Sequence, residues 1–222
     1  MINIKYNNID DNLNTQGFLL LEGIFLNEVN AFLDILDIKI DTDRYQKGFF
    51  KDDLEKYKIG DFFNNPILSR IIKNQFPQGA VYSNNFFYRS FKNCPGTKAH
   101  ADHVYFKQKK KFFTIWIAVD DITIDMGPLY VFPHDISSKI IDTTYLNQQI
   151  DSNDTTNNNG WQAAVIDNIK YPLHTKDLKK GDCFIFNSDI VHGTLDNFTS
   201  KRRQSLDMRV ADSRNYDKRW FN

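Results

Sequence analysis

Cysteine is scarce in this sequence, and its absence narrows the kinds of protein it can encode. Among 222 residues only Cys94 and Cys183 occur, far apart and in no metal-type spacing. Two thiols can form one disulfide, but that bond is favoured only in an exported protein. The opening residues, MINIKYNNID, show no cationic segment followed by an apolar one, so we expect no secretory signal. We therefore expect free thiols, with Cys183 buried as a small apolar side chain.

An excess of either charge and a long hydrophobic run are also missing. Lys+Arg and Asp+Glu number 28 each, for a net charge of +0, so no positive field attracts nucleic acid as a partner. The longest nearly apolar run, GFLLLEGIFL, is shorter than the roughly 20 residues that a membrane-spanning helix needs. We therefore expect a cytoplasmic protein without a membrane span.

Hydrophobic residues are plentiful, at 41%, and aromatic residues reach 14%. This composition supports a sizeable core and a single domain over residues 1–222. From residue 81 onward, short segments rich in aromatic and β-branched residues are separated by Gly, Pro and Asn-Asp clusters. Such strands without intervening helices predict an antiparallel jelly roll. They are VYSNNFFYRSF, AHADHVYF, KFFTIWIAVDDI, GPLYVFP, CFIFN and QSLDMRV.

The expected organisation is mainly β with flanking α. We assign residues 1–80 to a largely helical support layer, because LNEVNAFLDILDI and NPILSRIIKNQF have helical apolar spacing. Residues 81–212 form the jelly-roll core, a double-stranded β-helix. Residues 137–176 interrupt it and include the polar tract DSNDTTNNNG, which predicts a long loop. A loop of this length is either a functional lid or disordered.

The segment HADH places two histidines and an aspartate in four positions. On a strand, His100 and Asp102 share one face, roughly 7 Å apart, while His103 points to the other face. An HxD pair alone is weak evidence, since polar residues are common at strand ends. His192, after the apolar strand CFIFN, would complete two histidines and one carboxylate. That set is typical of non-haem Fe(II) oxygenases, which keep open positions for substrate and O₂.

Arg203 begins the next strand-like run after His192. A guanidinium that faces the interior of a barrel needs an anionic partner, and a carboxylate held by two hydrogen bonds suits its fork. The alternative is a surface arginine in a salt bridge. Neighbouring Arg202 is the better candidate for the solvent-facing position.

Several segments together resemble the phytanoyl-CoA dioxygenase family of Fe(II)- and 2-oxoglutarate-dependent oxygenases. The resemblance runs in the family's order from about residue 10 to residue 212. It is carried by NTQGFLLLEGIFLNEVNAFLDIL, PGTKAHADHVYF, TIWIAVDDITIDMGPLYVFP and LKKGDCFIFNSDIVHGTLDN.

The resemblance implies roles for particular residues. Three side chains would hold the iron, two would anchor the distal carboxylate of 2-oxoglutarate, and two lie on a strand that lines the cosubstrate pocket. In that order they are His100, Asp102 and His192; Arg203 and Thr194; and Thr114 and Trp116. Ser205, two residues after Arg203, points the same way along its strand, and we expect it to assist Arg203.

The resemblance also implies an activity. The enzyme would use Fe(II), 2-oxoglutarate and O₂ to hydroxylate an unactivated C–H bond of a small soluble molecule, with release of succinate and CO₂. Asp102 favours hydroxylation, because related halogenases lack this carboxylate. The chain departs from the family at FPHDIS, where His134 directly follows Pro133 and either contacts substrate or ends a strand. Nothing in the sequence specifies an acyl-CoA substrate.

Two other classes of function remain open at this point. One is a non-catalytic jelly-roll protein that holds a ligand or an inert metal. The other is a cupin-type enzyme that uses a different metal and no 2-oxoglutarate, for which Arg203 and Thr194 have no purpose. His174 is read as an ordinary polar residue rather than a ligand. The basic run KQKKK at 107–111 either attracts a phosphate or carboxylate of the substrate or forms a solvated hairpin loop.

Overall fold

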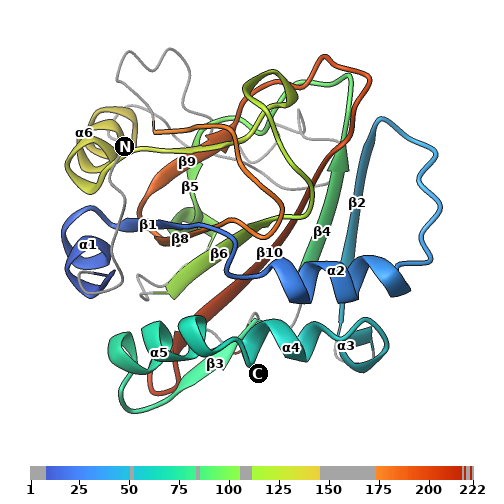
Figure 1. Ribbon diagram of the computed structural model, residues 1–222. Coiled ribbons are helices and arrows are strands. Elements are labelled where there is room, and N and C mark those ends of the chain that lie inside the picture. The colour runs from blue at the N-terminus through green and yellow to red at the C-terminus, as the bar shows by residue number, and fades with distance from the viewer. Residues whose placement is uncertain are drawn as a thin grey trace.

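The computed structural model describes residues 9–50, 53–83, 86–105, 112–145 and 174–216, together with Lys218 and Phe221. Helices and short strands are mixed up to residue 82, and strands predominate thereafter (Figure 1). The helices are α1 (Ile9–Thr15), α2 (Leu26–Ile35), α3 (Asp53–Lys56), α4 (Ile59–Phe63), α5 (Pro66–Gln75) and α6 (His134–Tyr145). The strands are β1 (Phe18–Leu21), β2 (Arg44–Phe49), β3 (Ala80–Tyr82), β4 (Phe86–Phe91), β5 (His100–Ala101), β6 (Phe112–Ala118), β7 (Leu129–Val131), β8 (Cys183–Asn187), β9 (Val191–Thr194) and β10 (Arg203–Asp212).

Two antiparallel sheets organise the described residues. The larger sheet has the strand order β1-β8-β6-β10-β4-β2, with β3 added to β10, and the smaller has the order β5-β9-β7. Strands that are neighbours in each sheet are far apart in the chain, as in β1 with β8 and β5 with β9. Two sheets joined by such long connections make a jelly roll, which confirms the predicted fold class.

The larger sheet buries one face against helices α2, α4 and α5 (Figure 1). Strand β6 shows why: Phe113, Ile115 and Ile117 alternate along it and are fully buried in this core. Phe32 of α2 and Phe62 of α4 pack there with their rings 6.4 Å apart. Each fully buried side chain of this kind contributes roughly 1.5–3 kcal/mol.

The other face of the larger sheet looks toward the smaller sheet. Here Trp116 and Ala118 of β6 pack with Phe184 and Phe186 of β8 and with Leu129 of β7. Because successive side chains of a strand point to opposite faces, one strand serves both the helix-covered core and this inter-sheet space. A pocket lies in this space.

Residues 1–80 are mixed rather than a simple helical layer. The segment provides strands β1 and β2 of the larger sheet as well as helices, so the expectation of a helical support layer is not confirmed. The second predicted helix is present as α5, with Pro66 at its first position. The Asn65 side chain accepts hydrogen bonds from the backbone N–H groups of Ile67 and Leu68, which stabilises the start of that helix.

The prediction of a long loop at 137–176 is wrong for residues 137–145. Residues 137–145 form most of helix α6, whose start is tied down because the Ser137 hydroxyl donates to the Phe132 carbonyl and accepts from the Val191 N–H. The tract at 151–160 and the basic run at 107–111 lie outside the described residues. Among the described helices, none has the length and apolar character to cross a membrane.

Candidate metal centre and its pocket

Two histidines from distant parts of the chain meet across the smaller sheet. Antiparallel pairing of β5 with β9 places His100 directly opposite His192, and their ring centroids lie 4.4 Å apart. Position 193 needs glycine, because a Cβ there would lie 2.4 Å from the Tyr130 hydroxyl oxygen. The pairing register therefore brings the two imidazoles together on the pocket side of the sheet.

Asp102 completes the group, though not by the predicted geometry. Strand β5 ends at Ala101, and Asp102 begins a short 3₁₀ helix, Asp102–Tyr105. One carboxylate oxygen, Oδ1, lies 3.7 Å from Nε2 of His100 and 3.8 Å from Nε2 of His192. All three ligand atoms lie within 4.8 Å of one another. The predicted triad is thus assembled, by a turn at the strand end rather than by strand alternation.

The three side chains suit a divalent transition metal. His100 Nδ1 lies 2.8 Å from the Lys98 carbonyl and His192 Nδ1 lies 2.9 Å from the Ile190 carbonyl. With Nδ1 donating to a carbonyl, each ring presents the lone pair of Nε2 to the centre. Burial lowers the pKa of both imidazoles, which keeps them neutral. Two neutral imidazoles and one carboxylate are the donor set of non-haem Fe(II) sites.

The second oxygen of Asp102, Oδ2, is surrounded by donors. Thr114 Oγ1 donates to it at 2.5 Å, and Arg209 approaches it through Nε at 3.2 Å and Nη2 at 3.1 Å. Burial alone would raise the pKa of Asp102, but the Arg209 guanidinium and the Thr114 hydrogen bond hold that pKa well below its ordinary value. The carboxylate is therefore ionised. Thr114, predicted to face the cosubstrate, contacts a candidate metal ligand.

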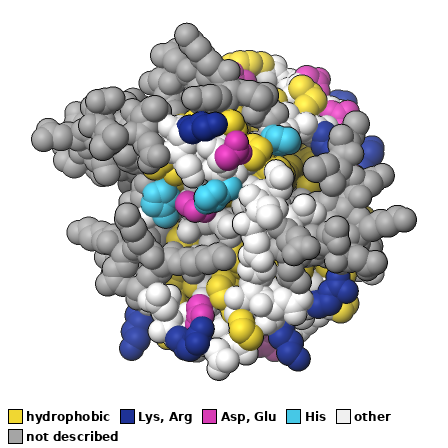
Figure 2. Space-filling view, turned by 90° about the vertical axis from the view of Figure 1, so that its left-hand side faces the viewer, with side chains coloured by type: hydrophobic (Ala, Val, Ile, Leu, Met, Phe, Trp, Pro, Cys, Tyr) yellow, Lys and Arg dark blue, Asp and Glu magenta, His cyan; other side chains and the backbone are white. Residues whose placement is uncertain are grey.

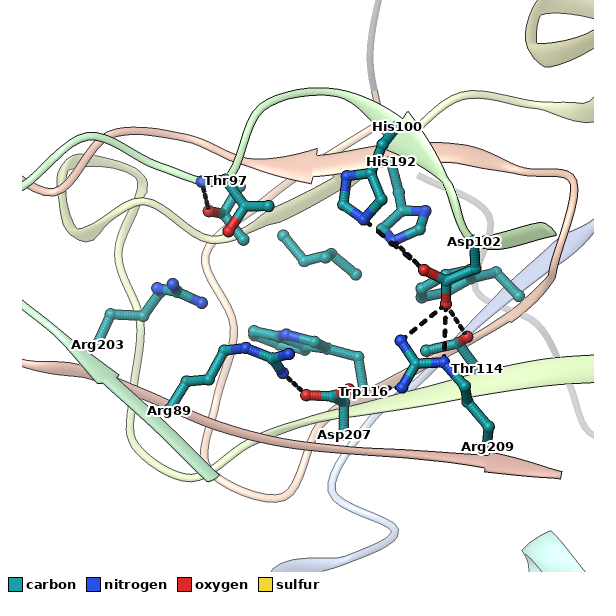
Figure 3. A pocket seen from close by; sticks show the side chains of 13 residues that line it. Arg89, Thr97, His100, Asp102, Thr114, Trp116, His192, Arg203, Asp207 and Arg209 are labelled. Atoms are coloured by element: carbon teal, nitrogen blue, oxygen red, sulfur yellow. Dashed lines mark hydrogen bonds and ion pairs between the residues drawn. The ribbon is translucent and has the colours of Figure 1, made fainter. Parts of the chain in front are cut away.

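Arg203 lies at the other end of the same pocket (Figure 3). Arg203 is 1% exposed, and its guanidinium stacks over the Phe91 ring, with Cζ 4.9 Å from the ring centroid. Burial lowers the pKa of Arg203 to about 10, which leaves it charged at neutral pH. Within the described part of the chain, no carboxylate pairs with it. The surface-arginine interpretation is wrong, and Ser205 contacts Arg203 itself, at 3.5 Å from Nη1.

Thr194 and Trp116 also line the pocket. The Thr194 hydroxyl oxygen accepts a hydrogen bond from the Thr97 backbone N–H at 2.7 Å. Trp116 is 5% exposed and packs with the inter-sheet core as well. It therefore provides an apolar wall of the pocket and packing for the sheet.

Histidine and acidic side chains also meet on one outer face of the molecule (Figure 2). His134 forms a contact of this kind, with Nε2 3.4 Å from Oδ2 of Asp189 and both side chains about half exposed. It is not among the residues that line the pocket. His103 turns its ring toward the Ser188 carbonyl and stands outside the triad, as predicted. The substrate contact suggested for His134 stays a prediction.

The sequence analysis missed three charged residues that line the pocket. They are Arg89 on β4 and Asp207 and Arg209 on β10. Asp207 lies between the two arginines, with Oδ1 paired to Arg89 and Oδ2 3.3 Å from Arg209 Nη1. Strand alternation contained the signal, since every second residue from Arg203 to Arg209 is polar. The same alternation places Asp207 and Arg209 on the face of β10 that carries Arg203.

The neutral histidines predict a pH effect on the metal-free protein. Below the unfolded-state pKa of about 6.5, the unfolded chain binds protons that buried His100 and His192 do not bind in the folded protein. The free energy of unfolding therefore decreases as the pH is lowered. Each histidine contributes a slope of at most about 1.4 kcal/mol per pH unit. Urea denaturation at pH 7.5 and pH 5 measures it. His192→Gln should flatten the dependence and exposed His174→Gln should not; equal curves for both would contradict this explanation.

Solved structures support the fold. The epimerase SnoN, in a complex with Fe3+, alpha ketoglutarate and nogalamycin RO, superposes with a TM-score of 0.66 at 16% identity, covering 94% of this chain and 84% of that one. The alpha ketoglutarate dependent carbocyclase SnoK gives 0.65 at 15% identity, covering 95% and 85%. HygX from Streptomyces hygroscopicus, with nickel and 2-oxoglutarate bound, gives 0.61 at 12% identity, covering 90% and 84%.

At the sequence level, no curated protein matches the chain. The family model described as phytanoyl-CoA dioxygenase (PhyH) matches residues 16–205, which include the triad and Arg203. The match extends from the residues just before β1 into β10 and so spans both sheets. This chain belongs to the phytanoyl-CoA dioxygenase family.

Proposed function

We propose that the protein is an Fe(II)- and 2-oxoglutarate-dependent oxygenase that hydroxylates an unactivated C–H bond of a small molecule. The observation that carries this proposal is the coexistence of two features in one pocket. One is the His100, Asp102 and His192 triad, and the other is Arg203, a buried cation without a carboxylate partner among the described residues. A metal alone explains the triad, whereas an anionic ligand is needed to balance Arg203.

The charges of the pocket favour Arg203 as the carboxylate anchor. Arg89 is neutralised by Asp207, and Arg209 is held between Asp102 and Asp207. Arg203 is thus the cation that can take a new anion without breaking an existing ion pair. Its planar fork matches a carboxylate by two parallel hydrogen bonds.

Other residues would complete the binding of 2-oxoglutarate. The Thr194 hydroxyl, whose oxygen already accepts from Thr97, would donate its hydrogen to the same distal carboxylate. Trp116 would cover the carbon chain between that carboxylate and the metal and exclude water. When bound, Fe(II) with 2-oxoglutarate and O₂ supplies the oxidation of the C–H bond, with succinate and CO₂ as coproducts.

The relatives named above as an epimerase and a carbocyclase define the alternative outcomes within this chemistry. Hydroxylation incorporates one oxygen atom from O₂ into the product, whereas epimerisation and ring closure leave the product without it. Once a substrate is found, turnover under ¹⁸O₂ distinguishes them by the mass of the product. Retention of one ¹⁸O atom supports hydroxylation, and a product without the label supports one of the other reactions.

The first experiment does not require the substrate. Anaerobic apoprotein receives one equivalent of Fe(II) and then 2-oxoglutarate, and the weak visible charge-transfer absorption of the chelate is monitored. We expect the band to appear in the wild type. Well-folded protein that holds iron and gives no band would contradict the proposal and favour a binding protein or a cupin-type enzyme without 2-oxoglutarate.

A further inference from the structure

Four ionised side chains of alternating sign run along one wall of the pocket. From the candidate metal centre outward they are Asp102, Arg209, Asp207 and Arg89 (Figure 3). Asp102 and Asp207 are 1% and 3% exposed, so both carboxylates are removed from water. Burial of such charges is costly unless each is paired, and in this chain each is.

The chain of charges makes the two oxygens of Asp102 unequal. Oδ2 accepts from the Thr114 hydroxyl and from two nitrogens of Arg209, Nε at 3.2 Å and Nη2 at 3.1 Å. Oδ1 faces Nε2 of both histidines. Rotation of the carboxylate would break contacts with a charged donor, and each such hydrogen bond is stronger than a neutral one.

We propose that Arg209 is a positioning residue that makes Asp102 a metal ligand through one oxygen, and that Asp207 keeps Arg209 in place. This inference rests on the proposed function, because it concerns the metal of that site. A carboxylate that binds through both oxygens occupies two coordination positions, and the second would be taken from the cosubstrate or O₂. Engaging Oδ2 from outside therefore preserves the open positions on which this chemistry depends.

Arg209 suits this task better than Thr114 does. A threonine supplies one hydroxyl hydrogen, whereas the guanidinium offers Nε and Nη2 to the same oxygen and uses Nη1 for Asp207. The planar guanidinium of Arg209 pairs with Asp102 and with Asp207 at the same time, which restricts its rotation. Asp207 is itself fixed because Arg89 takes its other oxygen. The position of Asp102 is thus determined by a strand, β10, that carries none of the metal ligands.

The test measures metal binding without turnover. Co(II) is titrated into apoprotein, and its affinity and visible absorption spectrum are recorded. We expect Arg209→Gln to weaken Co(II) binding roughly 10- to 100-fold, the usual range for loss of such a support. We also expect its spectrum to differ from that of the wild type, because Oδ2 then keeps only the Thr114 hydrogen bond and can approach the metal. Asp207→Asn should weaken binding in the same direction by a smaller factor.

Two controls separate positioning from a general loss of structure. Arg214→Gln removes another arginine that pairs with an aspartate, Asp212, but on the surface, and it should leave Co(II) affinity and spectrum unchanged. In Arg209→Ala, added methylguanidinium should restore affinity and spectrum, because Arg209 lines the pocket and leaves room for the small cation. If Arg209 variants fail to fold, Asp207→Asn decides the question.

The results distinguish this inference from the proposed function. Wild-type protein that binds one Co(II), together with Arg209→Gln of equal affinity and equal spectrum, would overturn the inference and leave the oxygenase proposal intact. If the Arg209 variants do not fold, unchanged Co(II) binding by Asp207→Asn would likewise overturn the inference and leave the oxygenase proposal intact. Wild-type protein that binds no Co(II) at all would overturn both. Weaker binding with an altered spectrum, restored by methylguanidinium, supports the role of Arg209.

Discussion

Replacing His192 with alanine is expected to abolish the conversion of 2-oxoglutarate to succinate. The side chain is one of three candidate ligands, and the 3.8 Å between its Nε2 and Oδ1 of Asp102 leaves space for one shared ion. Loss of a ligand should weaken metal binding by more than the roughly 100-fold that loss of a supporting residue can cause. Succinate formation and bound iron per chain are the two measurements.

The matched control for this variant is His134→Ala. It removes a half-exposed histidine that pairs with Asp189 and does not line the pocket, so iron content and succinate formation should remain at wild-type levels. Near-ultraviolet circular dichroism of both variants checks the fold. Unchanged succinate production by a folded His192→Ala variant would rule out the proposed metal centre.

Replacing Arg203 with alanine is expected to raise the 2-oxoglutarate concentration required for half-maximal turnover by about 30-fold or more. The estimate follows from the loss of at least about 2 kcal/mol when one partner of a buried, hydrogen-bonded charge pair is removed. Because Arg203 lies at the end of the pocket away from Asp102, metal affinity should be unchanged (Figure 3). A titration of turnover against 2-oxoglutarate at saturating Fe(II) measures the effect.

Arg202→Ala provides the control, since the neighbouring residue points away and donates from Nη1 to the Thr42 carbonyl at the surface. An unaltered requirement for 2-oxoglutarate in Arg203→Ala would remove the carboxylate anchor from the proposal. Arg203→Met adds a second readout without turnover. Because it replaces a buried charge that pairs with no carboxylate of the described residues by an apolar side chain, we expect the ligand-free protein to become more stable. We also expect 2-oxoglutarate to add little further stability to the variant.

Membership of the phytanoyl-CoA dioxygenase family leaves the substrate open. The named neighbours at 12–16% identity share the fold, and they include an epimerase and a carbocyclase. A shared fold does not fix the reaction, because function depends on the residues of the site.

The sequence by itself determined the parts of this protein that depend on local chemistry. Residue types at 100, 102, 192 and 203, with the flanking strand segments, were sufficient to predict the jelly roll, the triad and a buried guanidinium. Helix α5 was also predicted from the sequence, because Pro66 at its start and the helical spacing of its apolar residues are local features of the chain. Such features need only neighbouring residues, or side chains whose chemistry has few alternatives, to be recognised.

Tertiary structure alone decided how these residues meet. The β5–β9 register that sets His100 against His192 joins segments far apart in the chain, and no local pattern specifies it. Asp102 reaches the histidines through a 3₁₀ turn that the HxD spacing did not indicate. The ion pairs from Arg89 through Asp207 and Arg209 to Asp102 required two neighbouring strands to be placed side by side. Long-range pairing and the burial of charge are properties of the packed sheets, which is why they emerged only with the fold.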